Sequence, residues 1–444
     1  MILPGRRGAR LLKLPTMSES AYHLFLPCAA GVEDWLEDEV RSLLSPSECL
    51  QGPKAFRGGV GLYGTMDAAM RLNLHSRLAQ RVLIEVAREE YRHEDDIYAI
   101  ARTVDWTRWI TPRQTLRVDT TAQRSPLRSL NFATLRVKDA VCDLLREDTG
   151  ERPSVDTRWP DLPLQLHLTE DLATVYVDSS GEPLFKRGWR EDKGDAPLKE
   201  TLAAAMLAAA GWKGARDQGG ALHDPCCGSG TIPVEAATIA CNIAPGIQRR
   251  FAFEKLKPFQ PLLPAWRAMK EAARAAERAP EVPIFASDVS FRMVDFARRN
   301  AERAGVAQYI QFNGGDALER PAPKLPDDMP GTLMLNPPYG ERIEVRGKAG
   351  AHRADGGALS EERDAGDDFF PRLSAHWKRA YTQHEAGWTA WLLCPEMKLP
   401  SKMRLKESRR IPMWNGPIEC RLFKFDLVAG SARKQNPGNA DSDE

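Results

Sequence analysis

The sequence predicts an α/β protein in which a Rossmann-like domain with a mostly parallel sheet follows a smaller α+β region. From residue 198 to residue 335, short apolar strands alternate with amphipathic helices, a pattern typical of doubly wound parallel sheets. Before residue 180, short strands surround a few helices without that alternation, which is typical of α+β modules. The polar, glycine-rich stretch 179–196 separates the two patterns and is predicted to be a linker.

The N-terminal region divides into two expected modules, at 19–65 and 66–178, because strand and helix patterns recur in both. The expected elements there are strands at 21–27, 59–63, 81–86, 115–120, 164–168 and 172–177, and helices at 31–44, 66–73 and 131–147. Residues 1–18 are basic but lack the apolar core of a signal peptide, so we expect a disordered extension there.

The Rossmann-like domain is expected to span residues 197–430, followed by a disordered polar tail at 431–444. Its expected elements are strands at 221–224, 284–287, 309–313 and 332–335, and helices at 198–210, 232–241 and 290–305. The charged stretch 342–368, rich in glycine and alanine, is predicted to be a mobile loop.

Composition excludes several classes of protein. The 62 lysines and arginines nearly balance the 61 aspartates and glutamates, so any nucleic-acid surface must be local. No apolar run is long enough to cross a membrane. The eight cysteines are scattered, and neither they nor the histidines have metal-ligand spacing. The sequence therefore predicts a cytoplasmic protein without a metal site.

A glycine-rich turn, His-Asp-Pro-Cys-Cys-Gly-Ser-Gly-Thr at 223–231, links the strand at 221–224 to the next helix. Gly228 and Gly230 permit a tight turn and close approach of a ligand to the backbone. The N–H groups at the helix terminus beyond them favour a carboxylate. Such glycines also occur where only the backbone geometry requires them, so the turn alone leaves both interpretations open.

Two acidic residues occupy matching places on the following strands. Asp288 closes one strand, where a carboxylate can accept hydrogen bonds from both hydroxyls of a ribose. Asp316 follows the next strand and could accept from an adenine amino group. Each could instead cap the helix that follows it. Three signals on consecutive strand ends nevertheless predict a nucleoside ligand that carries a carboxylate, and S-adenosylmethionine satisfies that description.

The candidate catalytic motif is Asn336-Pro337-Pro338-Tyr339, directly after an apolar strand. An amino group conjugated to a base or amide is a poor nucleophile, because its lone pair is delocalised. The Asn336 side-chain oxygen and the Pro337 carbonyl could accept hydrogen bonds from the two N–H groups of this amine. Tyr339 could stack on the planar target. The alternative is an Asn-Pro turn with a buried tyrosine.

These segments resemble class I methyltransferases, in which the Asn-Pro-Pro-Tyr pattern serves enzymes acting on adenine N6, guanine N2 and glutamine amides. AYHLFLPCAAGVEDWLEDEV, VKDAVCDLL, APLKETLAAAML, DPCCGSGT, NPPYGERI and WNGPIECRL, in this order, are similar to the bacterial 23S rRNA guanine-N2 methyltransferases with a THUMP domain. Many of these are fused to a second methyltransferase that makes 7-methylguanine, for which we expect no counterpart in this sequence.

The resemblance implies a ferredoxin-like module at 19–65, an RNA-binding THUMP domain at 66–178 and a class I methyltransferase domain at 197–430. It also implies a seven-stranded sheet whose last strand is antiparallel, with a hairpin turn at Asn415-Gly416. The residues that it implies for binding S-adenosylmethionine are Lys199, Glu200, Asp224, Cys226, Gly228, Ser229, Gly230, Thr231, Asp288, Asp316 and Asn336.

Basic residues concentrate between 113 and 138, where only Asp119 is acidic. The candidate contacts to structured RNA are Arg113, Arg117, Arg124, Arg128 and Lys138, with Arg136 beside them. A solvated surface with scattered arginines is the alternative. The resemblance to THUMP domains favours RNA binding.

The leading hypothesis is an S-adenosylmethionine-dependent methyltransferase that forms N2-methylguanosine in 23S rRNA. A transfer RNA guanine-N2 methyltransferase shares the chemistry. A non-catalytic RNA-binding assembly factor is disfavoured by the intact motifs, and a protein glutamine methyltransferase would leave the first 180 residues without a role.

Overall fold

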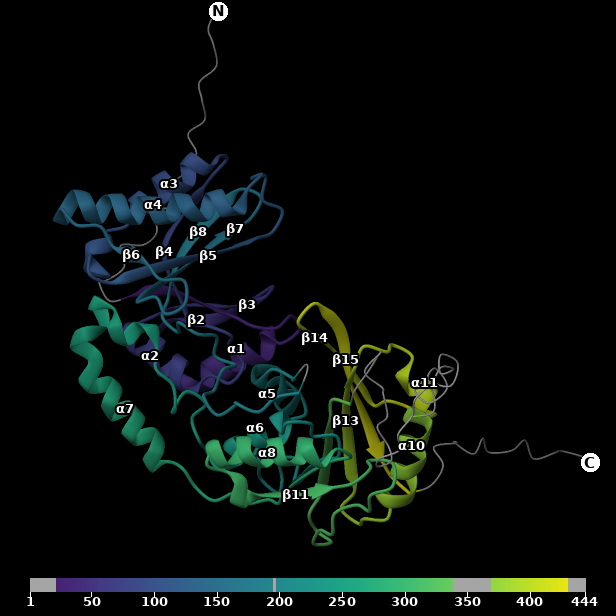
Figure 1. The fold of residues 1–444 in the computed structure, drawn as a ribbon. Helices are drawn as coiled ribbons and strands as arrows, with labels where there is room; N and C mark the ends of the chain where they lie inside the picture. Colours follow the sequence, from purple (N-terminus) through teal and green to yellow (C-terminus); the bar gives the residue numbers. More distant parts are fainter. Residues whose placement is uncertain (1–20, 195–196, 338–368, 430–444) are drawn as a thin grey trace, which may run out of the picture. The chain divides into compact units, whose positions relative to one another are not determined.

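A computed structural model describes residues 21–194, 197–337 and 369–429. The chain forms two compact units (Figure 1). Unit 1 contains residues 32–184 with the first strand and the later segment 244–274, and unit 2 contains residues 185–243 and the chain from 275 onward. The predictions for residues 1–18, 342–368 and 431–444, and those for Pro338 and Tyr339, fall outside the described residues.

Unit 1 is built on one eight-stranded sheet of order β2-β3-β1-β4-β8-β7-β5-β6. Its strands are β1 (Tyr22–Pro27), β2 (Cys49–Phe56), β3 (Gly59–Gly64), β4 (Leu83–Glu90), β5 (Thr115–Ala122), β6 (Ser154–Val155), β7 (Leu162–Leu168) and β8 (Leu172–Asp178). β4 pairs with β1 on one side and with β8 on the other. Both expected N-terminal modules therefore share a continuous sheet.

The helices of the first 184 residues are α1 (Glu33–Leu43), α2 (Met66–His75), α3 (Glu94–Arg102), the short η1 (Trp106–Arg108) and α4 (Leu130–Thr149). α4 begins where the Ser129 hydroxyl accepts from the Phe132 N–H, and it ends at Gly150, whose φ is 80°. Its buried residues recur at helical spacing, among them Ala133, Val137 and Ala140. That face packs on the sheet, and α3 lies beside α4 (Figure 1).

The segment 244–274 returns to unit 1, although it lies between two strands of the Rossmann-like sheet in sequence. It contains η2 (Ala252–Lys255), η3 (Lys257–Leu262) and most of α7 (Leu263–Ala275). Three backbone N–H groups attach it, at residues 246, 253 and 257, which donate to the carbonyls of Leu74, Ser179 and Trp109. Its own buried aromatic residues are Phe251, Phe253, Phe259 and Trp266. The alternation of strands and helices in the sequence did not predict that this segment packs with unit 1.

Unit 2 contains a seven-stranded sheet of order β11-β10-β9-β12-β13-β15-β14. Its strands are β9 (Ala221–Asp224), β10 (Ile284–Asp288), β11 (Ile310–Gly314), β12 (Gly331–Leu335), β13 (Trp388–Cys394), β14 (Arg409–Asn415) and β15 (Ile418–Leu427). The first five are parallel, and β15 is antiparallel to its neighbours. The expected fold class and the antiparallel last strand are confirmed. The hairpin loop comprises Gly416 and Pro417, one residue beyond the expected Asn415-Gly416 turn, because Asn415 still pairs with Ile418.

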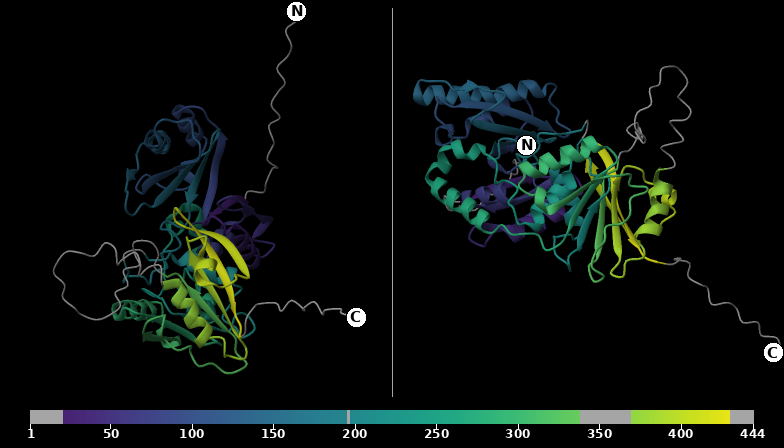
Figure 2. Two further views of the ribbon diagram at one scale, coloured as in Figure 1. Left: turned by 90° about the vertical axis from the view of Figure 1, so that its right-hand side faces the viewer. Right: turned by 60° about the horizontal axis from the view of Figure 1, so that its bottom comes forward.

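Helices cover both faces of this sheet (Figure 2). They are α5 (Glu200–Ala209), α6 (Thr231–Ala240), α8 (Phe291–Arg303), η4 (Ala307–Tyr309), α10 (Phe369–Ala380) and α11 (Leu399–Met403). α5, α6 and α8 form one layer, while α10 and α11 pack on the opposite face (Figure 1). All five residues of β12 are buried, as expected for a strand with both faces covered.

The stretch 179–196, predicted to be a linker, is packed into protein over much of its length. Ser179, Ser180 and Arg187 are buried, because their polar groups find partners within the fold. The helices that the structure describes lack the combination of length and apolar character needed to cross a lipid bilayer.

Candidate active site

The glycine turn lies at the carboxyl end of the central strand β9, where α6 begins. Gly228 and Gly230 have φ values of 53° and 89°, which favour glycine. A Cβ on Gly230 would lie 2.8 Å from that of Ala297, so this glycine lets α8 pack against the turn. A Cβ on Gly228 would meet nothing within 4 Å. The turn is therefore tight on its protein side and open above Gly228.

The three predicted acidic residues close or follow β9, β10 and β11, which are adjacent and parallel. In Asp224, Asp288 and Asp316 alike, one carboxylate oxygen accepts from the backbone N–H two residues later, at 3.0, 2.9 and 2.9 Å. The second oxygen of Asp288 accepts from the Gly228 N–H at 2.9 Å. Each carboxylate thus orders its own turn, and Asp288 also fixes the glycine turn.

The surroundings of these carboxylates disfavour negative charge. Burial raises the pKa of Asp288. Burial raises the pKa of Asp224 well above its ordinary value, and the nearby Asp288 charge adds to this. Burial also raises the pKa of the Cys226 thiol, and the charges of all three aspartates contribute. The three aspartates are therefore near enough to Cys226 for their charges to disfavour its thiolate.

Asn336 and Pro337 directly follow β12, which pairs with β9 in parallel. Neighbouring strands lie about 4.8 Å apart, so Asn336 leaves the sheet beside the strand that carries the glycine turn. Its side-chain oxygen is buried and has no hydrogen-bond partner among the described residues. A buried polar atom without a partner costs free energy and calls for an explanation. This oxygen is thus able to accept a hydrogen bond from an N–H or O–H donor.

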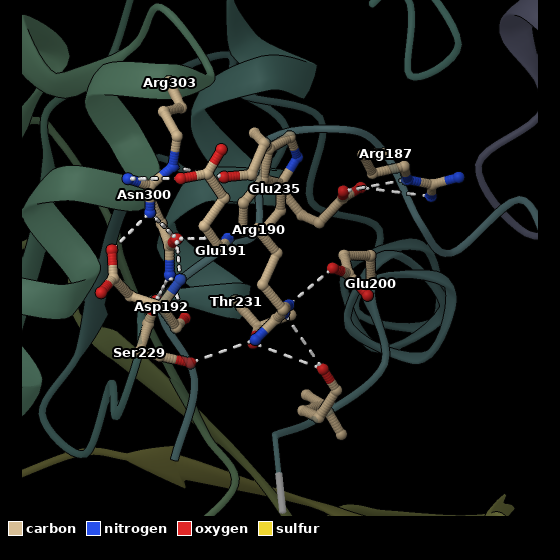
Figure 3. Close-up of polar contacts among 12 residues, drawn as sticks. Arg187, Arg190, Glu191, Asp192, Glu200, Ser229, Thr231, Glu235, Asn300 and Arg303 are labelled. Carbon is tan, nitrogen blue, oxygen red and sulfur yellow. Dashed lines mark hydrogen bonds and ion pairs between the residues drawn. The ribbon is translucent and has the colours of Figure 1, made fainter. Parts of the chain in front are cut away.

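Lys199 and Glu200, which the resemblance implies for cofactor binding, each contact a residue of the segment before α5. The Glu200 carboxylate is 3% exposed and accepts from Arg190 Nε at 2.7 Å (Figure 3). The Lys199 ammonium lies over the Phe185 ring, 5.1 Å from its centroid. Arg190 was missed in the sequence, because arginines in a polar stretch without periodicity are typical of a solvated segment.

The five basic residues predicted to bind RNA lie on several different elements. Arg113 and Arg117 lie at the start of β5, while Arg124 and Arg128 lie beyond its end. Arg117 pairs with Asp119 at 2.8 Å, and Lys138 pairs with its neighbour in sequence. Arg113, Arg124 and Arg128 are exposed. Of these, Arg124 and Arg128 lie in the loop between β5 and α4.

Exposed apolar side chains accompany that loop. Phe132, in the first turn of α4, is 48% exposed, and Leu130 and Leu135 are also exposed. Arg136 lies over the rings of Tyr98 and Phe132. Among the described residues, no group of three or more metal-ligand side chains could hold an ion.

Three family models match this chain. Residues 187–351 match one described as an RMKL-like methyltransferase domain, residues 91–178 match the THUMP domain, and residues 23–83 match the RlmL ferredoxin-like domain. The chain therefore joins a THUMP domain to an RMKL-like methyltransferase domain. The expected resemblance is confirmed.

Curated relatives extend this match along most of the chain. The ribosomal RNA large subunit methyltransferase K/L of Psychromonas ingrahamii is 34% identical over 91% of this chain and 50% of its own length. That of Pseudomonas paraeruginosa is 36% identical, with 91% and 53% covered. The chain thus spans about half the length of these relatives.

A solved structure is similar over most of this chain. The crystal structure of SMU.472 in complex with SAH has a TM-score of 0.76 and 25% identity, and the match covers 94% of this chain and all of that one.

Proposed function

We propose that this chain transfers a methyl group from S-adenosylmethionine to the exocyclic N2 of a guanine in 23S ribosomal RNA. The observation that carries the proposal is the buried Asn336 side-chain oxygen, which lacks a partner among the described residues at the strand end beside the glycine turn. Two similarities support it: the named activity of the curated relatives, and the SAH bound to SMU.472.

The cofactor fits the chemistry of the donor set. The N–H groups at the start of α6 would hold the cofactor carboxylate. The Asp288 carboxylate would accept from the ribose hydroxyls, and Asp316 would accept from the adenine amino group. The aspartates near Cys226 would favour the positive charges of the ammonium and sulfonium. When bound, S-adenosylmethionine supplies an electrophilic methyl group on its sulfonium.

Asn336 and Pro337 prepare the nucleophile. The Asn336 oxygen accepts one N–H of the target amine and the Pro337 carbonyl accepts the other, which turns the nitrogen lone pair out of conjugation. Proline has a fixed φ, and Pro337 is buried, so its carbonyl is held in place. No strong base is required, because a methylated, positively charged nitrogen loses its proton readily to water.

A direct assay tests this function. The purified chain is incubated with unmodified 23S rRNA and isotopically labelled S-adenosylmethionine, and the RNA is digested to nucleosides for mass spectrometry. We expect labelled N2-methylguanosine. Label in N6-methyladenosine, or in transfer RNA instead of ribosomal RNA, would contradict the substrate assignment. Absence of label in any RNA under conditions in which SAH binds would contradict the activity.

Cofactor affinity should rise with pH through the raised pKa of Asp288. The ribose hydroxyls bind a carboxylate more strongly than a neutral carboxyl group, and burial keeps Asp288 protonated to higher pH than an ordinary aspartate. Calorimetric titration of SAH across the acidic range up to neutrality measures this rise. Asp288→Asn should bind weakly at every pH, with a flatter profile. A wild-type affinity that is constant across the range would contradict the role.

The same raised pKa has the opposite effect on the stability of the ligand-free protein. Because the folded-state pKa of Asp288 lies above the unfolded value, folding favours the protonated carboxyl group. The contribution is therefore present at low pH and is lost as the pH rises through the folded-state pKa. SAH should restore stability at the higher pH, since it binds the charged form.

We infer that the loop between β5 and α4 contacts RNA phosphates through Arg124 and Arg128, which are exposed. Replacing both with Ala should weaken RNA binding and reduce the slope of log affinity against log salt by about 2. Replacing both with Lys keeps the charge and should leave that slope unchanged. Fluorescence anisotropy in a salt titration measures both effects. An identical slope in the alanine variant would contradict these contacts.

The same proposal places the protein in the cytoplasm, where ribosomal RNA is modified in bacteria. All eight cysteines are free thiols, which suits a reducing compartment.

A further inference from the structure

The segment at residues 187–192 crosses behind the glycine turn and is tied to it by Arg190 (Figure 3). The Arg190 guanidinium donates from Nη1 to the Ser229 hydroxyl at 3.1 Å and from Nη2 to the Thr231 hydroxyl at 2.7 Å. These two residues flank Gly230, at the point where α6 begins. One side chain therefore bridges the two hydroxyl-bearing residues of the turn.

The charge of Arg190 is held in place by α5. Its Nε donates to Glu200 at 2.7 Å, and Nη2 also donates to the Leu198 carbonyl at 3.3 Å. The two side chains are 12% and 3% exposed. A guanidinium has five N–H donors, and four of them are used in these contacts. The arginine is thus fixed in one orientation, because any rotation would break several bonds in a desolvated place.

The backbone of Ser229 is fixed from the other side. Asn300 on α8 is fully buried, and its Nδ2 donates to the Ser229 carbonyl at 2.9 Å and to the Asp192 carbonyl at 2.7 Å (Figure 3). The Asn300 oxygen in turn accepts from Arg303 at 2.6 Å. The segment 187–192 and the glycine turn are therefore joined through two side chains that approach Ser229 from different elements.

The contact with Arg190 limits the directions in which the Ser229 O–H group can donate. A hydroxyl oxygen carries one O–H donor and two acceptor sites. The Ser229 oxygen accepts from Arg190, so its own proton is free to point away from the guanidinium. Ser229 belongs to the turn whose N–H groups face the carboxylate of the cofactor in the proposed site. A hydroxyl donor and the cationic guanidinium behind it complement a negative group there.

We propose that Arg190 is a positioning residue for the amino-acid end of S-adenosylmethionine: it orients the Ser229 and Thr231 hydroxyls and places a positive charge behind the turn that receives the cofactor carboxylate. This role rests on the proposed cofactor site. The ribose and adenine ends lie with Asp288 and Asp316 in that site, so Arg190 should matter only for ligands that carry the amino-acid group.

Two ligands separate the two ends of the site. SAH carries the carboxylate and ammonium, whereas 5′-methylthioadenosine carries the same nucleoside without them. Calorimetry with the full chain should show that Arg190→Met weakens SAH binding by about 10- to 100-fold and changes 5′-methylthioadenosine binding by less than about twofold. Arg190→Lys keeps the charge and should recover part of the loss. Arg298→Met, on the exposed side of α8, is the matched control and should bind both ligands as wild type.

Kinetics give a second readout. Arg190→Met should raise the KM for S-adenosylmethionine by a similar factor and lower kcat by less, because Asn336 and Pro337 are left in place. Glu200→Gln should also weaken SAH binding selectively, with a smaller effect than Arg190→Met, since it only loosens the arginine.

The ratio of the two affinities decides the proposal. Equal losses for SAH and 5′-methylthioadenosine would show that Arg190 merely supports the fold, and no loss for either would show that it has no role, so both results overturn the proposal. A destabilised variant still yields the ratio, since partial unfolding weakens both ligands equally. If the wild-type chain bound neither ligand, the cofactor site itself would be refuted.

Discussion

Asn336→Ala should reduce kcat by at least about 100- to 1000-fold while SAH binds almost as tightly as to wild type. Removing one preorganised polar group that stabilises a transition state typically costs this much, and the Asn336 oxygen is the buried acceptor without a described partner. Most of the proposed cofactor contacts lie at the ends of β9, β10 and β11, so they should survive the change. Single-turnover methylation of 23S rRNA, alongside calorimetry with SAH, measures both quantities.

Two controls make this result specific. Asn313→Ala removes an exposed asparagine from β11 of the same sheet and should retain wild-type turnover. Asn336→Asp keeps an acceptor oxygen of the same size and should retain more activity than the alanine variant. Wild-type kcat in Asn336→Ala would remove the amine-orienting role. A parallel loss of SAH affinity would mean that the residue acts through the cofactor instead.

The sequence predicted the part of the site that depends on local chain geometry. A strand, a glycine turn and a helix follow one another directly around Gly228, so their order along the chain fixes their order in space. The same holds for Asp288, which closes a strand and heads a helix. Because parallel strands end at one edge, separate local signals combine into a single site.

Residues that act through long-range contacts were not predicted. Arg190 contacts the glycine turn 39 residues later, and no local pattern distinguishes it from a solvated arginine. The same is true of Asn300, a polar residue inside a helix whose side chain is fully buried. Their partners exist only after α5, α6 and α8 have packed, so neither composition nor periodicity reveals them.

The RNA-binding prediction rested on closeness in sequence, which does not by itself fix closeness in space. Arg117 and Arg124 are near neighbours along the chain, but β5 is extended over its eight residues and separates them. Two of the predicted side chains are paired with aspartates. Phe132, beside the β5–α4 loop, is exposed. A search for basic residues in the sequence does not find it.

The second large effect concerns stability and comes from Arg187, which the sequence placed in a polar linker. Its side chain is 2% exposed and donates to Glu235 on α6, which is 1% exposed, at 3.1 and 3.4 Å (Figure 3). Burying two charges is favourable only while each compensates the other. This pair therefore joins the residue-187 segment to α6, the helix that starts at the glycine turn.

Glu235→Ala should lower the free energy of unfolding by about 3–5 kcal/mol, because it leaves the Arg187 charge buried without its carboxylate. Differential scanning calorimetry should show a melting temperature about 10 °C lower for the methyltransferase unit. Glu281→Ala removes an exposed partner of Arg278 and should cost less than about 1 kcal/mol. The double replacement Arg187→Met with Glu235→Met should be less destabilising than Glu235→Ala, since no charge is stranded. Equal melting temperatures for Glu235→Ala and Glu281→Ala would show that the buried pair contributes nothing beyond an ordinary surface ion pair.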